Sequence, residues 1–76
     1  MNRRRLGAWQ CASGNGVDVY FVRNPDGLGL IAFEWDAPPP LSRADQVEYE
    51  QTILPAVVQR MQEYLEVVGP ALVVLA

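Results

Sequence analysis

Two glycine-terminated turn signals constrain the fold of this chain more than any other feature. They read Ser13-Gly14-Asn15-Gly16 and Asn24-Pro25-Asp26-Gly27, so the third residue is Asn or Asp and the fourth is Gly in both. This pattern is typical of a type I turn followed by a left-handed glycine, which closes a three-residue hairpin loop. The sequence therefore predicts two consecutive hairpins built from three strands.

The loop length can be checked against burial, because a slip of one residue would send every side chain to the opposite face of the sheet. With Gly27 as the bulge residue, Asn24 lies opposite Leu28 and one face becomes uniformly apolar. That face holds Val17, Val19, Phe21, Ile31, Phe33 and Trp35, and with Gly16 as the first bulge it also holds Trp9 and Cys11. The reverse face is mixed and holds Ala8, Gln10, Ala12, Asp18, Tyr20, Val22, Leu30, Ala32 and Glu34. We therefore expect Cys11 to be a buried, unreactive thiol.

A long helix is predicted after the three prolines at positions 38–40. Ser42 followed by Asp45 resembles a capping box at its start, and Gly69-Pro70 ends it. Its apolar stripe consists of Ala44, Val47, Leu54, Val58, Met61, Leu65 and Val68, with Ile53, Val57 and Tyr64 beside it. Pro55 interrupts this span, and the pattern leaves open whether it kinks the helix or splits it.

A last strand is predicted over residues 71–76, which gives a single α+β domain over residues 1–76 with element order β-β-β-α-β and a flexible arm at residues 1–5. We expect a mixed four-stranded sheet in the order 3-2-1-4, with the one long helix packed on one face. This arrangement is similar to the first half of ribonuclease-H-like folds and to small antitoxin domains. The similarity is one of element order.

The composition argues against most enzyme classes, because the chain has no His, no Lys and a single Cys. Imidazole bases, Schiff-base lysines and the lysine of a P-loop are therefore absent, and we expect no enzyme, no cofactor and no metal site. A carboxylate-dependent hydrolase using Glu34 and Asp36 stays as an alternative. The single Cys and the lack of a membrane-length apolar run predict a cytoplasmic protein with no membrane contact.

The last predicted strand points to a partner, because residues 71–76 are apolar on both sides while one helix can cover only one face of the sheet. We therefore expect a regulatory or interaction module that forms a homodimer through a sheet edge or the uncovered face, with a further protein partner possible. The partner-binding residues would be Tyr20, Val22, Leu30, Val73 and Leu75. An antitoxin-like regulator that contacts nucleic acid through Arg3, Arg4 and Arg5 is the alternative, although the net charge of −3 disfavours polyanions.

Overall fold

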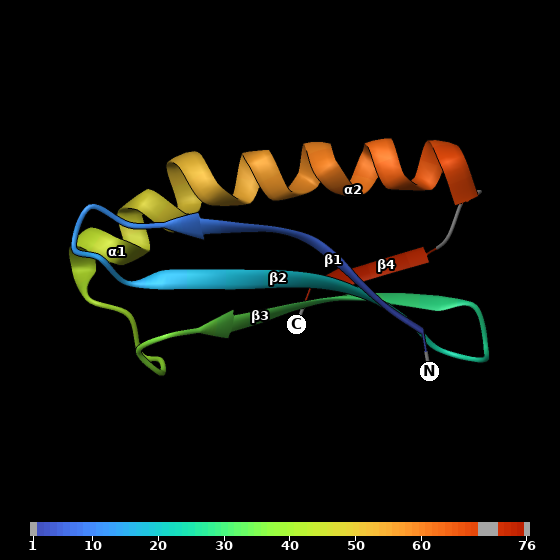
Figure 1. The fold of residues 1–76 in the computed structure, drawn as a ribbon, viewed down its shortest axis with the longest axis horizontal. Coiled ribbons are helices and arrows are strands. Elements are labelled where there is room, and N and C mark those ends of the chain that lie inside the picture. Colours follow the sequence, from blue (N-terminus) through green and yellow to red (C-terminus); the bar gives the residue numbers. More distant parts are fainter. Residues whose placement is uncertain (1, 69–71, 76) are drawn as a thin grey trace.

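A computed structural model describes residues 2–68 and 72–75 of the chain, with side chains over residues 3–67. Three strands come first, β1 (Asn2–Gln10), β2 (Gly16–Arg23) and β3 (Leu28–Trp35). A helical span follows, made of α1 (Arg43–Glu48), the π-helical turn η1 (Tyr49–Ile53) and α2 (Leu54–Val68). The short strand β4 (Leu72–Leu75) comes last. The antiparallel three-stranded sheet and the long helix are as the sequence predicts (Figure 1).

The second hairpin confirms the predicted register. Val17, Val19 and Phe21 lie opposite Trp35, Phe33 and Ile31. The Asn24 amide donates to the Leu28 carbonyl at 3.0 Å, and Gly27 has a φ of 87°. A left-handed glycine therefore closes a three-residue loop here.

The first hairpin has the predicted three-residue loop, but the loop lies two residues earlier in the chain than predicted. The Cys11 amide donates to the Asn15 carbonyl at 2.9 Å, and Gly14, rather than Gly16, has the positive φ, at 97°. The reason lies outside the turn, because the Asn15 side-chain carbonyl accepts from the Ala37 amide at 2.9 Å. Trp9 now pairs with Val17, a shift of four residues from the expected partner Phe21. An even shift preserves the facing of each side chain, so Cys11 is still buried.

Residues 2–5, which we expected to form a flexible arm, are instead the first part of β1 and pair with β2. A β-bulge between Arg5 and Gly7 makes this possible, because it turns Leu6 into the core, where it is 7% exposed. The Trp9 ring lies across Gly7, where an added Cβ would stand 2.9 Å from a ring carbon. The glycine therefore provides space for the tryptophan next to the bulge.

The helical span confirms the predicted cap and only part of the predicted stripe, since Met61 and Leu65 pack against the core. The Ser42 hydroxyl accepts from the Asp45 amide at 3.2 Å. Within η1 the Leu54 amide donates to the Tyr49 carbonyl, five residues back, directly before Pro55, which has no amide hydrogen to donate. Pro55 thus neither splits the helical span nor ends it.

The π turn changes which helical residues face the sheet. One extra residue in a turn rotates the preceding part of the helix by about 100° relative to the following part. Ala44 and Val47 are consequently exposed, although both were placed in the predicted apolar stripe. The buried positions are Ile53 and Val57, which we had placed beside that stripe.

The core lies between the helical span and one face of the sheet (Figure 1). Its buried side chains are Leu6, Cys11, Val17, Val19, Phe21, Ile31, Ile53 and Val57. Both helices lie on this side, so no described element covers the opposite face of the sheet. We call that uncovered surface the open face.

The predicted strand order 3-2-1-4 is wrong, because β4 pairs in parallel with β3 and the order is β1-β2-β3-β4. Three consecutive arginines and a bulge occupy β1, and both features disfavour pairing at its outer edge. The partner of β4 is the uncharged segment 28–31 of β3. With this order the likeness to ribonuclease-H-like and antitoxin domains no longer holds.

Candidate functional site

The open face brings together three of the predicted partner-binding residues. Val22 lies opposite Leu30, and Tyr20 lies opposite Ala32 in the adjacent row. Tyr20 and Leu30 are partly exposed, whereas Val22 is 8% exposed. An apolar centre thus lies on a face that no described element covers.

Val73 and Leu75, the other two predicted partner-binding residues, belong to β4, and their side chains lie outside the described part of the chain. In register they stand opposite Gly29 and Ile31, while Val74 stands opposite Leu30. The backbone therefore places a different residue of β4 in the row of Leu30.

The N-terminal arginines do not form one positive surface. Arg3 pairs with Glu34, and its guanidinium carbon lies 3.8 Å above the centre of the Tyr20 ring. Arg5 donates to Asp18 at 2.7 Å, and this hydrogen bond and the carboxylate charge raise the pKa of Arg5. Arg4 faces the other side of the sheet, with its guanidinium carbon 5.5 Å from the Tyr64 ring centre. Arg3, Arg4 and Arg5 thus do not form the cluster of unpaired arginines that the nucleic-acid alternative requires.

The two carboxylates of the hydrolase alternative each have a structural partner. Glu34 accepts from Arg3, and Asp36 accepts from the Gly16 amide at 3.2 Å. Asp36 also lines a shallow cavity of about 320 Å³, together with Asp18. Gly16 approaches Asp36 so closely that an added Cβ would stand 2.7 Å from its carboxylate. These contacts fix the end of β3 against the first turn.

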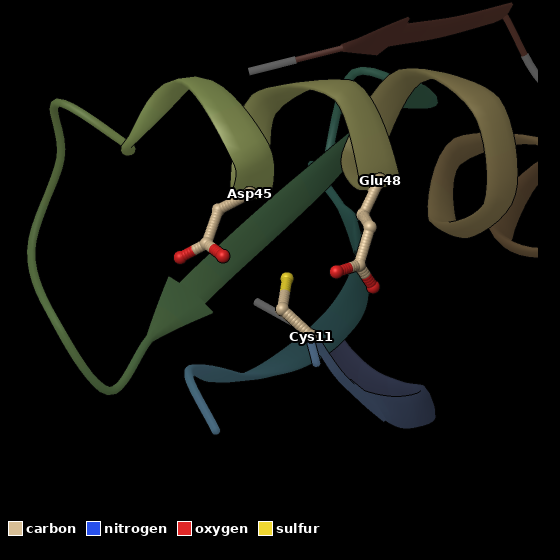
Figure 2. Close-up of side chains that lie close together, drawn as sticks. All are labelled: Cys11, Asp45 and Glu48. Atoms are coloured by element: carbon tan, nitrogen blue, oxygen red, sulfur yellow. The ribbon is translucent and has the colours of Figure 1, made fainter. Parts of the chain in front are cut away.

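A cluster that the sequence did not predict consists of Cys11, Asp45 and Glu48 (Figure 2). Cys11 comes from the end of β1, and the two carboxylates come from one side of α1, pointing toward the thiol. One ligand atom from each residue lies within 4.8 Å of the others. The three ligand atoms are close enough together to bind one metal ion. The spacing of Asp45 and Glu48, three residues apart in a helix, was the available sequence signal.

The hydrogen bonds of this cluster indicate a structural function. Asp45 accepts from the Ser13 hydroxyl at 2.8 Å and from the side-chain Nδ2 of Asn15 at 3.3 Å. Glu48 accepts from the Ala12 amide at 3.0 and 3.2 Å. Both carboxylates are thus already occupied by donors of the first turn, which they attach to α1.

Electrostatics keeps the thiol of this cluster protonated. Burial raises the pKa of Cys11, and the charges of Asp45 and Glu48 raise it further. A thiolate is the form that binds metals and attacks electrophiles. Cys11 is thus a core side chain at neutral pH, as the sequence predicted.

Comparisons with family models, curated proteins and solved structures found no match to this chain. No helix in the described part of the chain has the length and hydropathy needed to span a membrane.

Proposed function

We propose that this protein is an interaction module that acts as a homodimer, with the open faces of two copies packed together. The observation that carries the proposal is the apolar centre of the open face. Tyr20, Val22 and Leu30 lie next to one another on the side of the sheet away from both helices. Tyr20 and Leu30 are partly exposed there. Such apolar surface on a small domain favours association, because a second copy removes it from water.

The charges on the open face suit a second copy of the same chain. Arg3 and Arg5 lie on β1, at one side of the face, and Asp18 and Glu34 lie on β2 and β3. A two-fold axis lying in the plane between the two packed faces, level with Tyr20, would bring the arginines of each copy toward the carboxylates of the other. An isologous interface requires this kind of self-complementarity.

Sedimentation velocity over roughly 1 to 500 µM, a range suited to small interfaces, tests the proposal. We expect the wild-type chain to change from monomer to dimer within it, and Leu30→Lys to stay monomeric. Val67→Lys is the matched control, because Val67 is 84% exposed on α2 and away from the open face. Circular dichroism checks that both variants are folded. A wild-type monomer at the highest concentration would end the proposal.

Charge reversal identifies the interface more directly. One variant combines Arg3→Glu with Arg5→Glu, and a second combines Asp18→Arg with Glu34→Arg. These four positions of the open face then carry only negative charge in the first variant and only positive charge in the second. Each variant alone should be monomeric, and a mixture of the two should form a heterodimer that weakens with added salt. A mixture that sediments as monomers contradicts the two-fold arrangement.

A further inference from the structure

The outer edge of β3 is only partly paired. β4 lies alongside residues 28–31, and no described strand lies alongside residues 32–35. Hydrogen bonds to β2 use Leu28 and Asp36, since the Asn24 amide donates to the Leu28 carbonyl and the Asp36 amide donates to the Gly16 carbonyl. Bonding residues alternate along an antiparallel strand, so Phe33 and Trp35 direct their amides and carbonyls outward.

An apolar groove runs beside this free edge on the helix side of the sheet. Its volume is about 480 Å³. It is lined by Ala32, Phe33, Trp35, Pro39, Pro40, Leu41, Gln46 and Tyr49. The Tyr49 ring centre lies 5.4 Å from that of Phe33 and 6.0 Å from that of Trp35. The groove therefore offers aromatic contact to one face of an added strand.

Two carboxylates lie on the opposite side of the sheet at the end of β3, where Glu34 contacts Arg3 of β1 and Asp36 contacts Gly16 of β2. Glu34 lies on the open face, where about half of its side chain is exposed beyond the contact with Arg3. Exposed Asp36 directly follows the strand, and its described hydrogen bond comes from the neutral amide of Gly16. Side chains of an added strand would alternate between the groove and these carboxylates. The edge thus selects an alternation of apolar and basic residues.

We propose that an extended peptide with alternating apolar and basic side chains binds here by adding a strand along residues 32–35. Its backbone pairs with the outward groups of Phe33 and Trp35, its apolar side chains enter the groove, and its basic side chains approach Glu34 and Asp36. This mode of recognition takes affinity from backbone hydrogen bonds and specificity from alternate side chains. The site shares Glu34 with the proposed dimer interface but does not use Tyr20, Val22 or Leu30, so it does not rest on the homodimer.

Peptide titration followed by amide NMR of the ¹⁵N-labelled chain tests this site. The probe is a capped hexapeptide of alternating Val and Lys. Its controls are an alternating Val-Glu hexapeptide and a Val-Val-Val-Lys-Lys-Lys peptide. We expect the largest shifts at Phe33 and Trp35, with alternating Val-Lys binding most tightly. Equal affinity for the three peptides, or shifts centred on Tyr20 and Val22, would overturn the proposal.

Backbone pairing and charge are tested separately. A Val-Lys hexapeptide can be N-methylated at the two backbone amides that would face β3. It should bind about 30-fold more weakly than the unmethylated peptide, the effect of two lost hydrogen bonds of ~1 kcal/mol each. Glu34→Lys should weaken the Val-Lys peptide about tenfold at low salt. Glu66→Lys, the same charge change at an exposed position of α2, should leave binding unchanged. Undiminished binding of the methylated peptide would refute strand addition. Shifts at Phe33 and Trp35 that follow protein concentration without peptide would instead assign the edge to a second copy.

Discussion

Replacing Val57 and Val58 separately by Ala tests which side of the helix is buried. Val57 is 0% exposed, whereas Val58 is partly exposed. Val57→Ala removes two methylene equivalents worth ~0.8 kcal/mol each. A residual cavity of up to about 40 Å³ adds up to ~1 kcal/mol. We therefore expect Val57→Ala to lower the free energy of unfolding by about 2 kcal/mol and Val58→Ala by less than about 1 kcal/mol.

The two variants control for each other, because the gain in helix propensity from Val to Ala is the same at both positions. Urea unfolding followed by tryptophan fluorescence gives both free energies, at one fixed protein concentration because association adds to stability. A loss of about 2 kcal/mol is large for a chain of this size, whose total is typically ~3–5 kcal/mol. If Val58→Ala costs as much as Val57→Ala or more, Val57 does not face the core as described.

Four further outcomes follow from the turn, the thiol and the aromatic groove. Gly27→Ala should cost about 1–2 kcal/mol in urea unfolding, because φ at this position is 87°, and Gly27→Asn should cost less. The raised pKa of Cys11 means that the unfolded chain loses the thiol proton first, so stability should fall as the pH rises above about 8.5, and less so in Cys11→Ala. Asp45→Asn should accelerate alkylation of Cys11 by iodoacetamide at pH 8, because it removes a charge that raises the thiol pKa; an unchanged rate would contradict this assignment. Burial and the charge of Glu50 raise the pKa of Tyr49, so a second loss of stability should begin near pH 10 and be absent from Tyr49→Phe.

The sequence predicted correctly those parts of the fold that are held by hydrogen bonds between residues close together in the chain. The second turn and the Ser42 cap are closed by groups within four residues of one another, so their geometry could be derived from the sequence. The first turn differs because Ser13 and Asn15 bond to Asp45, about thirty residues away. Contacts between residues this far apart cannot be predicted from the sequence of the turn itself.

Two other differences arose from choices with nearly equal local support. The apolar stripe was drawn for a regular helix, and one extra residue before Pro55 was enough to turn Ala44 and Val47 out of line with the buried positions of α2. The last strand could join either edge of the sheet, and the charges on β1 decide between them. Cys11 was placed correctly in the core, but its two acidic neighbours could be assigned only once α1 was packed against the first turn.

Apart from Glu34, the two proposed surfaces use different chemical groups of β3 and are therefore separable. Leu30 contributes its side chain to the open face, whereas Phe33 and Trp35 contribute outward backbone groups to the edge and side chains to the groove. A substitution at Leu30 thus changes the apolar centre and leaves those backbone groups in place. Leu30→Lys should then abolish self-association while the alternating peptide still binds, because strand addition depends on main-chain hydrogen bonds. Loss of both properties in a folded Leu30→Lys variant would mean that the edge forms only when two copies are joined.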